Sequence, residues 1–175
     1  MRIDISVEIP FSRRAVFEAY RDKLPELVPY LENVRAIIVT SRSEEGHLVK
    51  LVNRWKGGGE IPAVVRKFLS EDLLEWDDHA TWDSQAFRCN WQTVVPAFRE
   101  SVDAKGFNTY VEKGPSLMQL TISGELKVDA AKIRGVPRIL AGTVSPAVEA
   151  FLVGRIKPNL IAVAKGVEKY LRSKA

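Results

Sequence analysis

The sequence predicts an α+β domain in which an antiparallel sheet is combined with one long C-terminal helix. Three observations predict it. Residues 2–9 alternate strictly between apolar and polar side chains, which is typical of a half-buried strand. Between residues 34 and 128, short β-branched and aromatic segments are separated by tight turns, which favours an antiparallel meander. The last third of the chain carries apolar residues at helical spacing.

Two short helices are expected directly after the first strand. Ser12 is a good N-cap because its hydroxyl can accept a hydrogen bond from an orphan backbone N–H. Phe11 before it and Val16 after it are placed for a hydrophobic staple. Residues 25–33 predict the second helix, with Pro25 in its first turn.

The middle of the chain predicts about six antiparallel strands. The segments with strand-like composition are residues 34–42, 47–56, 73–82, 86–95, 98–104, 107–114 and 117–128. The tetrapeptide DAKG at 103–106 and the pentapeptide EKGPS at 112–116 predict turns between the later segments.

The C-terminal region predicts one long helix of roughly 27 residues, because its apolar side chains recur every three, four or seven positions. This apolar stripe consists of Val144, Val148, Leu152, Ile156, Val163, Val167 and Leu171.

Composition indicates one soluble globular domain over residues 1–175. Cys89 is the single cysteine, so an intrachain disulfide cannot form. The N-terminal residues contain no apolar run of signal-peptide length, and no apolar segment approaches the roughly 18 residues that span a bilayer. We therefore expect a cytoplasmic protein.

The net charge of +4 is distributed unevenly. Residues 127–175 hold 10 Lys and Arg against 3 Asp and Glu, whereas the first 126 residues hold 16 against 19. A basic C-terminal third is compatible with an anionic membrane surface, although a solvated helix face explains it more simply. Nucleic acid is not an expected partner, because the basic residues are not interleaved with aromatic ones.

The order of these elements resembles the helix-grip fold of the START-like, or SRPBCC, superfamily. The resemblance covers nearly the whole chain and is carried by three segments: VEIPFSRRAVFEAY, LPELVPYLENVRAIIV and SPAVEAFLVGRIKPNLIAVAKGVEKYL. It implies a curved antiparallel sheet wrapped around the C-terminal helix and enclosing an apolar cavity. Most members of the superfamily bind a hydrophobic small molecule or lipid, and some catalyse reactions on it. None of the three segments is a catalytic motif.

The stretch GGGEIP at residues 57–62 raises the question of a phosphate site. It matches neither the P-loop pattern nor the dinucleotide fingerprint, and Lys56 precedes the glycines instead of following them. Two alternatives remain open. The segment is either a glycine hinge carrying a lid, with Val64, Val65 and Phe68 facing a cavity entrance, or a simple connector.

Aromatic residues mark the expected inner face of the sheet. Trp76 and Trp82 are an even number of residues apart, so they point to the same face of their strand. Phe87, Cys89 and Trp91 likewise share one face of the next strand. They suit an apolar ligand cavity, while a solid core is the alternative. The expected ligand-binding residues are Trp55, Val64, Val65, Phe68, Trp76, Phe87, Cys89, Trp91, Leu120, Val148 and Leu152.

The segment EWDDHATWD supplies the candidate catalytic residues. Asp77 and His79 share a strand face with Glu75, so a carboxylate could orient the imidazole as a general base. The pattern favours the solvated outer face for these three residues, because Trp76 and Trp82 are expected to point to the inner face. With two histidines and one cysteine in the chain, no metal site is expected, and no cofactor is expected either.

The sequence therefore predicts a protein that binds a hydrophobic small molecule or lipid in an internal cavity. The alternative is a polyketide cyclase or aromatase-like enzyme acting in the same cavity. The alternative requires an ionisable side chain that faces the cavity, for which Glu75, Asp77, His79 and Arg88 are the candidates.

Overall fold

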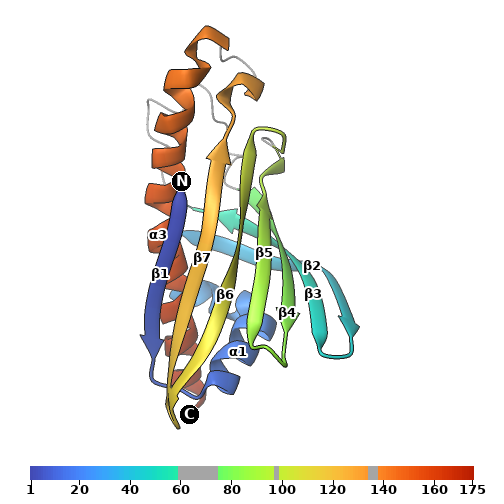
Figure 1. The fold of residues 1–175 in the computed structure, drawn as a ribbon. Coiled ribbons are helices and arrows are strands. Elements are labelled where there is room, and N and C mark those ends of the chain that lie inside the picture. Colours follow the sequence, from blue (N-terminus) through green and yellow to red (C-terminus); the bar gives the residue numbers. More distant parts are fainter. Residues whose placement is uncertain (59–74, 97–98, 134–137) are drawn as a thin grey trace.

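The computed structural model describes residues 1–58, 75–96, 99–133 and 138–175 (Figure 1). A seven-stranded antiparallel sheet has the strand order β1-β7-β6-β5-β4-β3-β2, and a long helix, α3, runs along one face of it. The strands are β1 (Arg2–Ile9), β2 (Val34–Glu45), β3 (Leu48–Gly57), β4 (Glu75–Asp83), β5 (Arg88–Val94), β6 (Val102–Gly114) and β7 (Leu117–Val128). The helices are α1 (Arg13–Asp22), α3 (Ala141–Lys174) and the 3-10 helices η1 (Leu24–Tyr30), η4 (Ala130–Lys132) and η5 (Arg138–Leu140).

The N-terminal region confirms the expected strand and two short helices. In β1, the alternate residues Ile3, Ile5 and Ile9 are buried, as the period-two pattern predicts. Ser12 caps α1, because its side chain accepts a hydrogen bond from the Ala15 amide at 3.3 Å. The second helix, η1, is 3-10 rather than α, and it contains two prolines. The proline inside it, Pro29, lacks the N–H that a continuing α-helix would need.

Strand β6 corrects one prediction. Residues 103–106 do not form a turn, because β6 runs without interruption from Val102 to Gly114. Gly106 is instead paired with Gly124 of β7, and the Trp91 ring covers both. A Cβ atom on Gly106 would lie 2.6 Å from that ring. The glycine is thus required by close packing and not by chain reversal.

Helix α3 spans 34 residues, longer than the roughly 27 expected from the apolar stripe, and continues through two internal prolines. It packs mainly against β1 and β7 of the sheet, and against α1 and η1. None of the helices within the described ranges is long and apolar enough to cross a membrane.

Gly57 and Gly58 continue the pairing of β2 and β3. Gly57 is the partner of Val34, and the Gly58 amide donates to the Asn33 carbonyl at 2.9 Å. The rest of the predicted lid or connector, with Val64, Val65 and Phe68, lies outside the described residues.

Candidate functional site

The inner face of the sheet is the face that packs toward α1 and α3. In β3 the alternate residues Val49, Leu51, Asn53 and Trp55 are buried on this face. The strand register places Trp55 opposite Trp76, and Asn53 opposite Asp78. Residues opposite each other in an antiparallel pair point to the same side. Asp78 therefore shares the inner face with its neighbours on β3.

All four tryptophans of the chain lie on the inner face. The rings of Trp55 and Trp76 stack with centroids 5.7 Å apart and planes inclined by 11°. The Trp91 ring lies over the two paired glycines, and its Nε1 donates to Asn108 Oδ1 at 2.9 Å. Trp82 is almost fully buried, 2% exposed.

One end of the inner face, here called the packed end, is filled by side chains. Phe17 of α1 makes edge-to-face contacts with Trp82, Phe87 and Tyr110, at centroid distances of 5.1–5.2 Å. Val163, Ala164 and Val167 of α3, together with Tyr20, complete this end and are all buried. No room for a ligand is expected here.

The other end, here called the half-buried end, is packed less completely. Its sheet residues Trp76, Asp78, Trp91 and Thr93 face inward, yet all four stay partly accessible. The described α3 side chains from Ala141 to Ala162 include none that is buried. Apolar and aromatic side chains at this end thus remain partly accessible, which makes it the candidate ligand site.

Asp78 is the ionisable group at this end. Burial raises the pKa of its carboxyl from 3.8 to about 7. The Asn53 amide opposite favours the charged form and opposes this shift. The effect of burial is the larger of the two. Asn53 Nδ2 forms no hydrogen bond of ordinary geometry. A carboxyl that titrates near neutral pH can give or take a proton under physiological conditions.

Among the described residues, four buried polar atoms on the inner face have no hydrogen-bond partner: Asn53 Nδ2, Trp55 Nε1, Trp82 Nε1 and Tyr110 Oη. Buried donors without a partner are rare in folded proteins and cost about 1–3 kcal/mol each. Asn53 and Trp55 lie opposite Asp78 and Trp76 of the half-buried end, so a ligand bound there could satisfy these two atoms. Trp82 and Tyr110 contact Phe17 at the packed end.

The neighbouring titratable groups remain protonated. Burial, reinforced by the charge of Asp78, raises the pKa values of Tyr20 and Cys89. Burial likewise raises the pKa of Tyr110. At neutral pH the two tyrosines offer neutral hydroxyls, and the Cys89 thiol is not activated as a nucleophile.

The predicted catalytic residues all lie on the outer face. Asp77 forms a two-pronged ion pair with Arg54, at 2.8 and 2.9 Å, and these hydrogen bonds lower the pKa of the carboxyl. His79 is exposed, and Glu75 pairs with Lys56 at 3.2 Å. The fourth candidate is Arg88, whose guanidinium lies 3.8 Å from the centroid of the outward-facing Phe107 ring. Within the described ranges, no three His, Cys, Asp or Glu residues are arranged to hold a metal ion.

The predicted ligand-binding residues that the structure describes lie in different places: on the inner face of the sheet, on α3 and in the turn before β5. Trp55, Trp76, Cys89 and Trp91 share the inner face, and Val148 and Leu152 of α3 are half-buried and pack against the core. Leu120 is fully buried in β7, opposite Tyr110.

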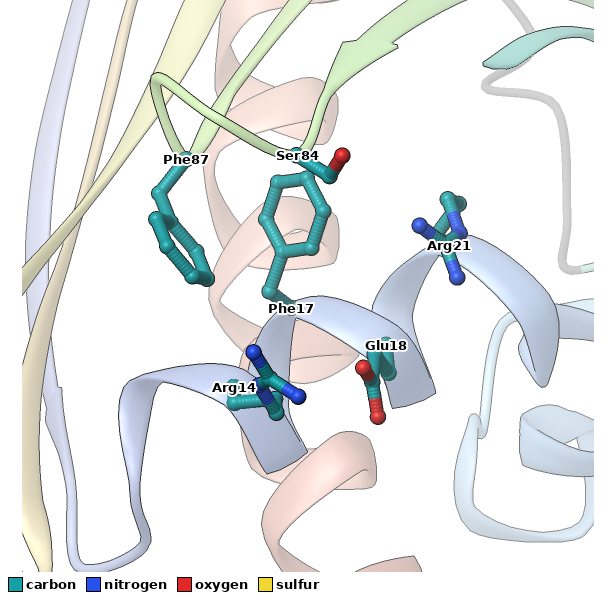
Figure 2. A pocket seen from close by; sticks show the side chains of 6 residues that line it. All are labelled: Arg14, Phe17, Glu18, Arg21, Ser84 and Phe87. Atoms are coloured by element: carbon teal, nitrogen blue, oxygen red, sulfur yellow. The ribbon is translucent and has the colours of Figure 1, made fainter. Parts of the chain in front are cut away.

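Phe87 lies in the turn before β5 instead of on the strand, and its φ of 48° breaks the alternation. Its ring lies against Phe17, and the Arg13 guanidinium is 3.9 Å from its centroid. Figure 2 shows it beside a separate pocket of about 290 Å³ between α1 and the turn that joins β4 to β5. The residues lining that pocket are Arg14, Phe17, Glu18, Arg21, Ser84 and Phe87.

Sequence reasoning missed Asp78 and Asn53, although the signal was present. Asp78 has the same parity as Trp76 and Trp82, and Asn53 has that of Trp55. The rule that placed the tryptophans inward also places these polar residues inward. A polar residue at a core-facing position of a strand pattern is the feature to look for.

Solved structures of known proteins have the same fold. The chain superposes on an aromatase/cyclase from a Streptomyces species with a TM-score of 0.68 at 14% identity, covering 97% of this chain and 92% of the other. A START superfamily protein from Mycobacterium smegmatis gives a TM-score of 0.56 at 12% identity, covering 99% of both chains.

Norcoclaurine synthase from Thalictrum flavum, in complex with dopamine and hydroxybenzaldehyde, gives a TM-score of 0.59 at 15% identity, covering 100% of this chain and 88% of the other. No protein-family model matches the sequence, and neither does any curated protein. These similarities establish the START-like helix-grip fold.

Proposed function

We propose that this protein binds an apolar, ring-containing small molecule between the half-buried end of the sheet and α3. The observation that carries the proposal is the inner face itself. Three tryptophans (Trp55, Trp76 and Trp91), the Asp78 carboxyl and two buried polar atoms without partners (Asn53 Nδ2 and Trp55 Nε1) lie on neighbouring strands on one side of the sheet. Flat rings bind well to tryptophan faces, and a few polar groups among apolar ones fix the orientation of a ligand.

The structural neighbours support this proposal. One is an aromatase/cyclase, and another holds dopamine and hydroxybenzaldehyde, both of which contain an aromatic ring. A long acyl chain, the lipid of the sequence prediction, would leave the Asn53 Nδ2 and Trp55 Nε1 donors without partners. A ligand with a ring and a polar group would use both features.

Tryptophan fluorescence tests the proposal directly, because every tryptophan of the chain lies on the inner face. We expect naphthalene-sized probes to change the fluorescence saturably. Thr93→Phe should weaken binding at least tenfold, because Thr93 lies opposite Asp78 on the inner face. Gln92→Phe is the matched control, since Gln92 is exposed on the outer face.

Two results would contradict the proposal: a fluorescence change that does not saturate, or equal effects of Thr93→Phe and Gln92→Phe. Native mass spectrometry of gently purified protein gives an independent check. A retained small molecule that is absent from the Thr93→Phe protein would support the same site.

Catalysis of the cyclase or aromatase kind is the second candidate function, and Asp78 is the observation that favours it. This carboxyl faces inward and its pKa is about 7, which suits a general acid or base. As a test, a bicyclic aryl ketone is incubated in deuterated water with the protein. Exchange of the α-protons that requires Asp78 would support catalysis, and exchange equal to that with Asp78→Asn would contradict it.

A further inference from the structure

Asp78 and Asn53 form an opposed polar pair among tryptophans. The two residues are direct partners in the register of β3 and β4, on the inner face. Trp76 is the next inward residue along β4 from Asp78, and Trp55 is the next along β3 from Asn53. Trp91 of β5 lies diagonally across. Diagonal neighbours on one sheet face are within reach of large aromatic side chains.

We propose that this pair binds the hydroxyl group of a hydroxyaromatic ligand, whose ring lies among Trp55, Trp76 and Trp91. The ligand hydroxyl donates to the Asp78 carboxylate and accepts from Asn53 Nδ2. This inference rests on the proposed function, and it names the chemical class of the ligand.

A hydroxyl is the group that satisfies both members of the pair. Asn53 is 1% exposed and its Nδ2 is a donor without a partner, so a ligand group that pairs with it must be an acceptor. An ionised Asp78 only accepts, so the ligand must also offer a donor. One oxygen bearing one hydrogen meets both requirements.

Other polar groups fit the pair less well. A ketone accepts from Asn53 but gives nothing to Asp78, and a ligand carboxylate would be repelled by the Asp78 charge. An ammonium group would suit Asp78, but it has no acceptor for Asn53 Nδ2. A hydrocarbon leaves both members without partners.

The charges around the pair do not favour another ligand. On α1, β5 and β6, the titratable groups whose pKa the Asp78 charge raises are Tyr20, Cys89 and Tyr110, all kept neutral mainly by burial. The charged neighbours on β3 and β4, Arg54 and Asp77, neutralise each other on the outer face. Among the described residues of α1 and of strands β3 to β6, Asp78 is therefore the charged group on this part of the inner face.

The test compares three probes of the same ring size: 2-naphthol, 2-methoxynaphthalene and 2-naphthylmethylamine. We expect 2-naphthol to bind the native protein at least tenfold more tightly than its methyl ether, because a hydrogen bond to a charged group is lost on methylation. We expect the amine to bind more weakly than 2-naphthol.

Variants locate the effect. Asp78→Asn and Asn53→Val should each reduce the preference for 2-naphthol over the ether to about threefold or less. Asp77→Asn is the matched control, because it removes the adjacent carboxyl from the outer face and should leave the preference unchanged. Thermal unfolding shows whether each variant is folded, and the comparison of probes on the native protein needs no variant.

The outcomes separate this inference from the proposed function. Equal binding of 2-naphthol and its ether would overturn the hydroxyl inference while leaving the ring-binding function intact. Tightest binding of the amine would also overturn it, in favour of a cation site. If no probe binds, both proposals fail.

Discussion

The two ends of the inner face differ in how completely their side chains are buried. At the packed end, Phe17 lies among three other rings, and Val163 and Val167 of α3 are buried. At the half-buried end, Trp76 and Asp78 are partly accessible although they face inward. One sheet and one helix thus provide a core that stabilises the fold at one end and a partly accessible aromatic surface, the proposed ligand site, at the other.

The largest expected effect comes from removing a ring at the packed end. Phe17→Ala should lower the free energy of unfolding by about 3–5 kcal/mol, because it leaves a cavity among the aromatic rings. Leu152→Ala, at the half-buried end, should cost only about 1 kcal/mol, since Leu152 is already partly accessible. Urea denaturation measures both. Equal losses would show that the two ends are packed alike.

A smaller effect is expected from Gly106→Ala, which tests how Trp91 is seated. The new Cβ would lie 2.2 Å from the Ser123 backbone oxygen and 2.6 Å from the Trp91 ring. We expect a loss of about 2–3 kcal/mol and weaker probe binding, because the ring must move. Gly114→Ala, in the same strand, is the control, since nothing lies within 4 Å of its Cβ position. Unchanged stability of Gly106→Ala would contradict this packing.

Asp78→Asn should instead stabilise the protein at alkaline pH. The pKa of Asp78 is raised on folding, so its stabilising contribution is complete below pH 3.8 and is lost as the pH rises to about 7. Above pH 7 the native protein carries a buried charge. Replacing that charge should raise the free energy of unfolding by about 2 kcal/mol at pH 8 while impairing 2-naphthol binding.

Asp77→Asn should change stability in the opposite direction. The pKa of Asp77 is lowered by its hydrogen bonds with Arg54, so the charged form stabilises the fold at neutral pH. Thermal unfolding at pH 8 compares the two variants. A loss of stability in both would contradict the assignment of Asp78 to a desolvating inner face.

The pH dependence of probe binding is the mildest expected effect. If the 2-naphthol hydroxyl donates to ionised Asp78, its affinity should fall about tenfold from pH 8 to pH 6, because Asp78 takes up a proton. The affinity of 2-methoxynaphthalene should stay nearly constant over this range. Fluorescence titrations at the two pH values measure both. Affinity for 2-naphthol that rises on acidification would mean that Asp78 binds as a donor.

Local patterns predicted most of the fold. The alternation in β1, the Ser12 cap and the apolar stripe of α3 are each encoded over a few neighbouring residues. The prediction of a turn at residues 103–106 was wrong because Gly106 is required by close packing against Trp91, which lies on another strand. A sequence pattern does not reveal a contact between residues so far apart in the chain.

The candidate site was only partly predictable. The alternation of inward and outward side chains along a strand correctly placed Trp76 and Trp82 on the inner face. Phe87 does not follow this alternation, because it lies in a turn and has a positive φ. The pairing of Asn53 with Asp78 depends on the register of two strands. That register follows from how the whole sheet assembles, so no single segment indicates it.

The most direct test of the account is the titration of the Asp78 carboxyl by carbon-13 NMR, with and without 2-naphthol. We expect a pKa near 7 in the free protein and a lower value when 2-naphthol is bound, because the hydroxyl stabilises the charged form. A pKa near 3.8 in the free protein would contradict the burial of Asp78 on the inner face. If 2-naphthol leaves the pKa of Asp78 unchanged, the proposal that Asp78 accepts a hydrogen bond from the ligand hydroxyl is contradicted.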